Sequence, residues 1–256
     1  MTARAFVRNV IKDTVMTGCH LLAPHPARWG LVLMYHSVGS EWGVTQDAFR
    51  WQLAEVARSY RIVAVRDLPR LLSRPSQRQL ACITFDDGYL DAVEVAAPVL
   101  GELGVPATFF VATSFIGRSF SNSFGTQPMM GAHDLAALVD SGHEIGAHTV
   151  THPKLTRITR AEAAQEICKS KDHLEDLLGI AVTSFAYPKG CWDTAVRDMV
   201  AGAGFVAACT NAEGHLRRDS DLLAMPRVSV LAGTTRAQFR AKLSRGLMLY
   251  EGVRRR

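Results

Sequence analysis

The chain has 256 residues, of which 48% are hydrophobic and 21% charged. This composition is typical of a globular protein and argues against extensive disorder. No stretch approaches the roughly 20 consecutive apolar residues of a membrane span. Its length therefore predicts one large domain or two small ones.

The formal net charge is +5 and the isoelectric point is about 9.1. This balance mildly favours anionic surfaces or polymers but identifies no partner. The basic residues read as scattered along the chain, apart from the closing Arg254, Arg255 and Arg256. A three-residue basic tail is more often a solvated terminus than a binding site.

Residues 1–28 are expected to form an amphipathic segment ahead of a folded domain over residues 29–256. Lys12, Asp13 and His20 interrupt the apolar run of roughly 7–15 residues that a secretory signal needs. Packing of this segment on the domain is the preferred interpretation. The alternative is a peripheral contact in which its basic face rests on an anionic membrane.

Short apolar runs alternate with helical patterns along the rest of the chain. The predicted strands are residues 31–35, 61–65, 80–85, 107–112, 144–147, 183–186, 205–209 and 228–231. The predicted helices are residues 45–60, 68–72, 91–103, 133–141, 159–178, 193–203 and 235–246. This alternation predicts an α/β fold with a parallel sheet, namely a distorted (β/α) barrel of about seven strands.

Polar residues follow several of the predicted strands. They are His36, Asp86, Asp87, His148 and the segment 188–190. Parallel α/β folds build their sites at the carboxyl ends of the strands, so these residues are site candidates. The long loop over residues 117–131 is either a flap over that site or a surface excursion.

Two of these segments suggest metal chemistry. Asp86 and Asp87 are adjacent carboxylates that point apart in an extended chain, so one can hold a metal while the other faces a substrate. His148 and His152 are four residues apart and can reach one metal from a single turn or tight loop. Each pattern taken alone also fits a plain turn or two unrelated polar residues.

A third segment, Pro188-Lys189-Gly190, has proline and glycine on either side of one residue. Such a rigid loop can present a backbone N–H group that stabilises an oxyanion. Taken alone, it is better explained as an ordinary turn between a strand and a helix.

In this order and spacing, the D-D-G, H-x-x-x-H and P-x-G segments resemble the polysaccharide deacetylases of carbohydrate esterase family 4, also called the NodB-homology family. The resemblance covers roughly residues 36–230. It includes the segments 104–110 and 142–146, which look like connecting strands of the family. It is closest to the poly-N-acetylglucosamine deacetylase branch, whose amino-terminal histidine motif matches residues 33–38 and thus His36.

The resemblance implies a hydrolase whose catalytic domain spans residues 29–256. Asp87, His148 and His152 would hold a divalent metal ion, with zinc the expected one. The metal would polarise an acetamide carbonyl and lower the pKa of a bound water.

The resemblance also implies roles for three further groups. Asp86 would act as general base towards the water and His36 as general acid towards the leaving amine. The backbone N–H of Lys189 would help to stabilise the oxyanion. Many members carry an arginine early in the third motif, but Ala186 stands there in this chain. Arg227, from a later strand, is the candidate to orient the base in its place.

The implied function is N-deacetylation of N-acetylglucosamine-type residues in a bacterial exopolysaccharide or surface polysaccharide. An alternative is a deacetylase or deformylase of a lipid-linked or nucleotide-linked amino-sugar precursor. A non-catalytic carbohydrate-binding protein is disfavoured because every key position carries a competent residue. A nucleic-acid partner is not expected, since the sequence shows no basic stripe or aromatic platform.

The five cysteines are odd in number and include no C-x-x-C pair. They predict neither a disulfide framework nor a cysteine zinc site. Reduced thiols favour the cytoplasm, and the amino-terminal segment allows a peripheral position at the inner membrane.

Aromatic side chains that could face a sugar are Trp42, Tyr89, Tyr187 and Trp192, each of which could equally be core.

Overall fold

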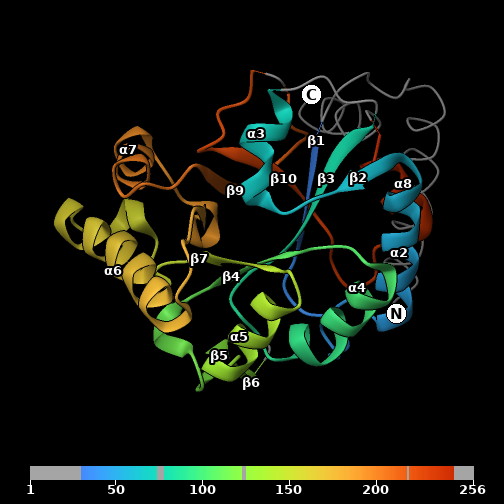
Figure 1. Cartoon of the computed structure of the whole chain (residues 1–256), viewed down its shortest axis with the longest axis horizontal. Coiled ribbons are helices and arrows are strands. Elements are labelled where there is room, and N and C mark those ends of the chain that lie inside the picture. The colour runs from blue at the N-terminus through green and yellow to red at the C-terminus, as the bar shows by residue number, and fades with distance from the viewer. Residues whose placement is uncertain (1–29, 74–77, 123–124, 218, 245–256) are drawn as a thin grey trace, which may run out of the picture.

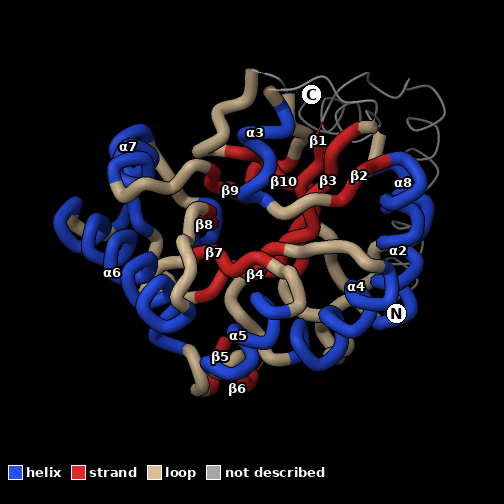
Figure 2. Tube along the Cα trace, viewed as in Figure 1, coloured by secondary structure: helices blue, strands red, loops and turns tan. Residues whose placement is uncertain are grey.

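A computed structural model describes residues 30–73, 78–122, 125–217 and 219–244. Seven parallel strands close into a barrel, with helices around its outside (Figures 1 and 2). In order around the barrel, the strands are β1 (Gly30–Tyr35), β3 (Gln79–Phe85), β4 (Thr108–Val111), β7 (Glu144–Ala147), β8 (Ser184–Ala186), β9 (Ala207–Glu213) and β10 (Met225–Ser229). The predicted distorted (β/α) barrel is thereby confirmed.

Within the described ranges, three further strands lie outside the ring. The short strand β2 (Tyr60–Ile62) pairs with the start of β3, and β4 takes over pairing near the end of β3. The strands β5 (Ser119–Asn122) and β6 (Gly125–Pro128) form an antiparallel hairpin. The outer helices are α2 (Gln46–Ser59), α3 (Leu68–Leu72), α4 (Ala97–Leu103), α5 (Ala132–Asp140), α6 (Arg160–Leu178), α7 (Thr194–Gly202) and α8 (Arg236–Lys242).

The period of two along each strand decides which side chains face the barrel interior. In β3, Ile83 and Phe85 join the core beneath the outer helices, whereas Cys82 joins the small core inside the barrel. Thr84 and Asp86 continue this inward series. Strands that are covered on both faces have continuous apolar sequences, and the barrel strands show this pattern. The same alternation brings Arg227 of β10 into the interior, because Met225 two residues earlier belongs to the inner core.

Several boundaries differ from the prediction. The strand predicted at 61–65 ends at Ile62, because the chain then bends across the barrel end and forms a 3₁₀ turn at Val65–Asp67. The helix predicted at 91–103 begins with a π-helical turn, η2 (Ala92–Ala96). The last barrel strand begins at Met225 rather than at residue 228, because Pro226 can stand in a strand where its missing N–H is not needed.

The loop predicted at 117–131 forms the β5–β6 hairpin over most of its length. No helix among the described residues is long and apolar enough to cross a bilayer. The four cysteines within the described ranges are free thiols, in line with the expectation of reduced cysteines. The predicted segment over residues 1–28 and Cys19 lie outside the described residues.

Candidate active site

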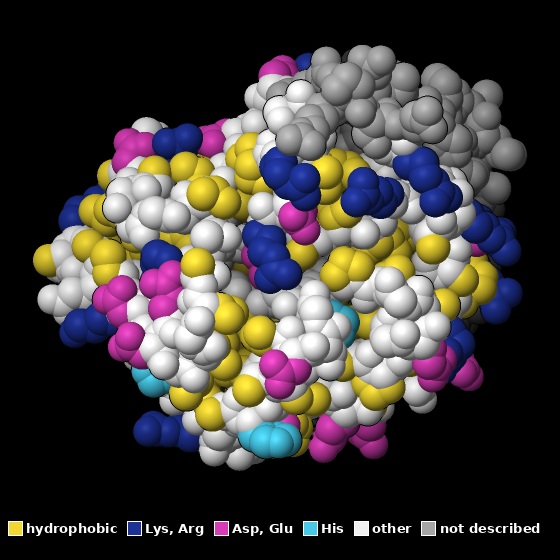
Figure 3. Space-filling model, in the orientation of Figure 1, with side chains coloured by type: hydrophobic (Ala, Val, Ile, Leu, Met, Phe, Trp, Pro, Cys, Tyr) yellow, Lys and Arg dark blue, Asp and Glu magenta, His cyan; other side chains and the backbone are white. Residues whose placement is uncertain are grey.

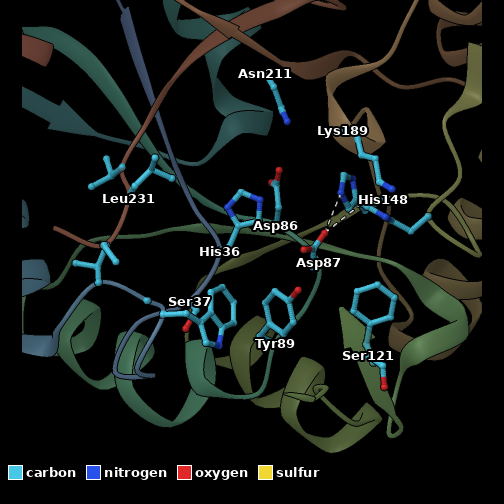
Figure 4. A pocket seen from close by; sticks show the side chains of 17 residues that line it. His36, Ser37, Asp86, Asp87, Tyr89, Ser121, His148, Lys189, Asn211 and Leu231 are labelled. Carbon is cyan, nitrogen blue, oxygen red and sulfur yellow. Dashed lines mark ion pairs between the residues drawn. The ribbon is translucent and has the colours of Figure 1, made fainter. Parts of the chain in front are cut away.

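An open cleft of about 840 Å³ lies at the carboxyl ends of the barrel strands. Figure 4 shows the residues that line it, contributed by loops after β1, β3, β7 and β8 and by the later part of the chain. The lining residues include His36, Asp86, Asp87, His148, His152 and Lys189. The fold therefore brings all three sequence motifs and the amino-terminal histidine to one place.

Three ligand-type side chains converge at the floor of this cleft. The Oδ1 atom of Asp87 lies 3.4 Å from Nε2 of His148 and 3.2 Å from Nε2 of His152. The three donor atoms all lie within 4.8 Å of one another. One carboxylate and two imidazoles at this spacing are a donor set that could hold a divalent metal ion, with coordination positions left open.

The protonation states of these groups also fit a metal. Nδ1 of His148 lies 2.7 Å from the carbonyl oxygen of Ala186, which can only accept a hydrogen bond. Nδ1 must then carry a proton, so Nε2 is the ring nitrogen that faces Asp87 and that would bind a metal once it has lost its own proton. Burial raises the pKa of Asp87, but hydrogen bonds from His148 and His152 outweigh it and hold the pKa well below its usual range. The carboxylate is therefore ionised, as a metal ligand must be.

The loop that carries the two histidines has an uncommon backbone. Thr149 and His152 adopt positive φ angles of 67° and 60°, in the left-handed region that non-glycine residues rarely occupy. The hydroxyl of Thr149 accepts a hydrogen bond from the backbone N–H of His152 at 3.1 Å. These torsions turn the chain tightly enough for His152 to face the same point as His148.

Glu166 of α6 holds this histidine loop in place by accepting hydrogen bonds from it. Its Oε2 atom accepts hydrogen bonds from the backbone N–H groups of Val150 and Thr151, both at 2.8 Å. Its Oε1 atom accepts a third hydrogen bond from the Thr151 hydroxyl at 2.7 Å. A carboxylate that holds three donors at once offsets the strained torsions and positions His152. No local sequence pattern points to Glu166, because the contact joins a loop to a helix 15 residues away.

Asp86 faces the barrel interior beside Asp87 and His148. Arg227 donates two parallel hydrogen bonds to it, at 2.7 Å to Oδ1 and 2.6 Å to Oδ2. The side chains are 0% exposed for Arg227 and 3% for Asp86, so this is a buried, bidentate ion pair. The guanidinium contact expected from the sequence is thus present.

Further partners hold the guanidinium of Arg227 in place. It donates to the carbonyl oxygen of Thr210, the hydroxyl of Thr84 and the side-chain oxygen of Asn211. Burial alone would raise the pKa of Asp86, but the charge and hydrogen bonds of Arg227 lower it overall. Asp86 is therefore an ionised carboxylate with fixed orientation, and lone pairs remain on both oxygens for a water molecule.

His36 follows β1 directly and lines the cleft next to the aspartates. In Figure 4 it lies on one side of the aspartate pair, and His148 and Lys189 lie on the other. The next residue, Ser37, donates a hydrogen bond to the carboxylate of Asp91. Burial raises the pKa of Asp91 to about 6, despite that hydrogen bond. The Ser37–Asp91 contact ties the loop that carries His36 to the start of the π-helical turn.

The loop after β8 presents Lys189 in a left-handed conformation with φ of 56°. Gly190 follows with φ of 66°, and a Cβ atom there would lie 2.6 Å from Cβ of Asn211. Only glycine fits that close approach. The loop thereby keeps a fixed backbone course over the wall of the cleft, where Lys189 is a lining residue.

Of the four aromatic residues considered for sugar contact, two line the cleft and two do not. Trp42 and Tyr89 line the cleft, and their rings meet edge to face at 5.1 Å. Tyr187 is fully buried and donates a hydrogen bond to the carbonyl of Leu223, so it is a core residue. Trp192 is 40% exposed and is not among the lining residues. Phe120 of the β5–β6 hairpin also lines the cleft, which the sequence analysis did not predict.

A sequence profile described as polysaccharide deacetylase matches residues 73–208, which is more than half of the chain. The chain therefore belongs to the polysaccharide deacetylase family, whose members are hydrolytic N-deacetylases of carbohydrate esterase family 4. The protein is accordingly a hydrolase that acts on linear amides.

Two curated relatives illustrate this membership. The chain is 26% identical to YxkH of Bacillus subtilis (strain 168) over 215 residues, which are 82% of this chain and 74% of YxkH. It is 31% identical to the chitooligosaccharide deacetylase of Bradyrhizobium sp. (strain ANU 289) over 127 residues. That match covers 49% of this chain and 52% of the relative. The chain thus spans most of the first relative and about half of the second.

Solved structures agree with the barrel. The Streptococcus pyogenes deacetylase PplD, in complex with acetate, superposes with a TM-score of 0.75 at 23% identity, covering 86% of this chain and all of that one. IcaB from Ammonifex degensii gives a TM-score of 0.74 at 23% identity, with 86% and 99% covered. At this identity the likeness establishes the fold.

Proposed function

We propose that this protein is a metal-dependent N-deacetylase of N-acetylglucosamine-type residues in a bacterial exopolysaccharide or surface polysaccharide. One observation carries the proposal. A carboxylate and two imidazoles converge within 4.8 Å beside a second, ionised aspartate, in a cleft open to solvent. This arrangement suits hydrolysis of an amide that enters the cleft from outside.

Asp87, His148 and His152 would hold the metal, and zinc is the proposed ion because imidazole and carboxylate ligands suit it. When bound, such an ion supplies a Lewis acid for the acetamide carbonyl and lowers the pKa of a water molecule. His148 contributes a fixed Nε2 lone pair, since its Nδ1–H is held by the Ala186 carbonyl. Glu166 keeps the histidine loop in the shape that aims His152 at the same point.

Asp86 is the proposed general base, because it is ionised and next to the ligand set. Arg227 prevents it from rotating and keeps both its oxygens charged. The attacking water gives its proton to a free lone pair of Asp86. His36 lies on the other side of the aspartates in Figure 4 and is the proposed acid that protonates the leaving amine. The backbone N–H of Lys189 is the proposed donor to the oxyanion.

The cleft walls support a sugar substrate. Trp42 and Tyr89 form an apolar corner on one wall, and Phe120 lies on the hairpin. Aromatic rings of this kind can pack against the apolar face of a pyranose. A cleft rather than an enclosed cavity also allows a chain to pass through, which favours a polymer or oligomer over a small precursor.

A substrate panel tests this proposal. Zinc-loaded protein is given N-acetylglucosamine oligomers, a nucleotide-linked N-acetyl sugar and a lipid-linked N-acetyl sugar, and acetate is measured. The proposal expects release from the oligomers, increasing with chain length. Release only from a nucleotide- or lipid-linked sugar would replace the polymer by the precursor alternative. Formate release from N-formyl analogues in place of acetate would indicate a deformylase.

A further inference from the structure

One segment holds a disproportionate share of the positive charge. Residues 58–78 contain six arginines, one aspartate and no lysine or glutamate. The arginines are Arg58, Arg61, Arg66, Arg70, Arg74 and Arg78. The whole chain has 29 basic and 24 acidic residues, so 23 of each remain outside this segment. The arginine segment (residues 58–78) therefore accounts for the entire net charge of +5, and the expectation of scattered basic residues was wrong here.

The described part of the arginine segment closes the amino end of the barrel. The backbone N–H of Val65 donates to the hydroxyl of Thr108, at the start of β4, at 3.0 Å. The backbone N–H of Arg66 donates to the carboxylate of Glu144, at the start of β7, also at 3.0 Å. Both partners lie at strand beginnings. The segment therefore crosses the barrel end opposite to the cleft.

The described arginines at this end are solvent-exposed, although Arg78 also donates hydrogen bonds to the carbonyl oxygens of Ala57 and Arg58. Arg58, Arg61, Arg66, Arg70 and Arg78 are all exposed. Figure 3 shows Lys and Arg side chains gathered over the part of the molecule where Figure 1 places α3 and β2. Among the described residues, no ion pair involves Arg61 or Arg66, while Arg70 is 3.4 Å from Asp67 and Arg58 is 3.3 Å from Glu55. The charges of Arg61 and Arg66 are thus not neutralised by an ion pair within the described residues.

Both ends of the described structure lie at this same face. Gly30, the first described residue, pairs with Leu80, two positions after Arg78. The Tyr60 hydroxyl donates to the carbonyl oxygen of Leu243 at 2.6 Å, next to Arg61. The flanking sequences are basic as well, since residues 1–29 hold four basic and one acidic side chain, and residues 245–256 hold four arginines and one glutamate.

The charge is therefore divided between two parts of the chain. The arginine segment and the two flanking sequences together hold 14 basic and three acidic residues. Subtraction from the totals leaves 15 basic and 21 acidic residues in the remainder, a net charge of −6. An anionic surface would attract the arginine segment at the amino end of the barrel and repel the net-negative remainder, and so would orient the molecule.

We propose that the amino end of the barrel, with the arginine segment at its centre, is a docking surface for an anionic phospholipid membrane. Arginine guanidinium groups bind lipid phosphates, and several such contacts together give reversible attachment to the membrane. Half-buried Leu71 and Leu72 lie beside Arg70 and add an apolar component. Docked in this way, the protein holds its cleft away from the lipid.

Lipid is favoured over nucleic acid for a chemical reason. Single-stranded nucleic acid is bound by aromatic side chains that stack on bases, between basic ones that contact phosphates. The arginine segment has one aromatic residue, Tyr60, and it is 4% exposed. The segment therefore offers charge without a stacking surface.

Vesicle sedimentation tests the docking surface with the full-length protein. One set of vesicles is pure phosphatidylcholine and the other contains about a third of phosphatidylglycerol, a fraction large enough for a strongly negative surface potential. The protein is expected to sediment with the anionic vesicles only, and less so as salt is raised. Each arginine near an anionic surface strengthens binding roughly fivefold, so Arg61→Gln with Arg66→Gln should weaken it roughly thirtyfold.

A matched variant separates local from overall charge. Arg157→Gln with Lys169→Gln removes the same charge from exposed positions on the carboxyl-end loops and α6, and should bind vesicles as the unaltered protein does. Both variants should retain full acetate release from soluble oligomers, so the vesicle result stands apart from the proposed function. Equal binding to both kinds of vesicle, or an equal loss in the two variants, would overturn the proposal. Tighter binding to duplex DNA than to anionic vesicles would overturn it in favour of nucleic acid.

Discussion

The pairing of Arg227 with Asp86 gives the sharpest prediction for the chemistry. Replacement of Arg227 by methionine keeps the apolar volume but removes the guanidinium that donates to both Asp86 oxygens. Because Asp86 is 3% exposed, a charge left there without its partner costs about 3–5 kcal/mol. Asp86 can avoid that cost by taking up a proton, so its pKa should rise.

A protonated Asp86 cannot accept the proton of the attacking water. We therefore expect Arg227→Met to reduce kcat/KM at neutral pH by roughly 10²–10⁴, the usual contribution of a general base. Activity should partly return as pH rises and Asp86 ionises. Metal content should stay unchanged, since the hydrogen bonds of Arg227 go to Thr84, Asp86, Thr210 and Asn211 and to none of the three ligands.

Three measurements on the same variant check this account: metal content, the pH profile of kcat/KM, and unfolding by urea. The folded-state pKa of Asp86 is depressed, so the pair stabilises the fold above the ordinary carboxyl pKa of about 3.9 and loses that effect as pH falls. Arg227→Met should lack this loss. The double variant with Asp86→Asn should regain stability but not activity. Wild-type turnover and an unshifted pH profile in Arg227→Met at full metal content would refute the reasoning.

Three further predictions concern residues around the site. Glu166→Gln loosens the histidine loop and should weaken zinc binding about 10–100-fold in chelator competition. The neighbouring Gln165→Ala is the control and should leave zinc affinity unchanged. Equal zinc affinities in the two variants would show that the Glu166 hydrogen bonds do not matter for metal binding. Lys189→Gly relieves a left-handed torsion and should stabilise the fold by about 1 kcal/mol. Acetate release should persist, because the proposed oxyanion donor is the backbone N–H. A large loss of turnover would assign the oxyanion contact to the lysine side chain instead. Burial raises the pKa of Asp91 to about 6, so the folded protein binds that proton more tightly and loses stability as pH rises from the unfolded value through 6. Asp91→Asn should remove about 1–2 kcal/mol of this pH dependence, after allowance for partial exposure. The free energy of unfolding is measured with urea at several pH values, and the same change in both proteins between about pH 4.5 and 7.5 would contradict the prediction.

Sequence patterns predicted the barrel and the placement of the motifs well, because both depend on local periodicity. Continuous apolar runs indicated strands buried on both faces, and polar residues just after them indicated the carboxyl ends. Asp86 and His148 each follow a strand directly, Asp87 comes next after Asp86, and the structure brings all three into one cleft. Their catalytic and metal-binding roles stay predictions.

Other features depend on contacts between distant segments, which periodicity does not encode. The Arg227 hypothesis came from a missing arginine at Ala186, but the strand that carries Arg227 begins at Met225, three residues before the predicted start. Glu166 and Asp91 act through loops that lie far from them in sequence. The arginine segment was overlooked because its charges are spaced through a strand, a turn and a helix and meet only when the chain folds over the barrel end.

Metal-dependent acetate release tests the central claim most directly. Protein stripped of metal by a chelator is given N-acetylglucosamine oligomers, with and without added zinc, beside an Asp87→Ala variant treated identically. We predict no release without metal, release after zinc is added, and none from Asp87→Ala, which loses one of three ligands. Equal acetate release by stripped and zinc-loaded protein, or by Asp87→Ala, would contradict the account.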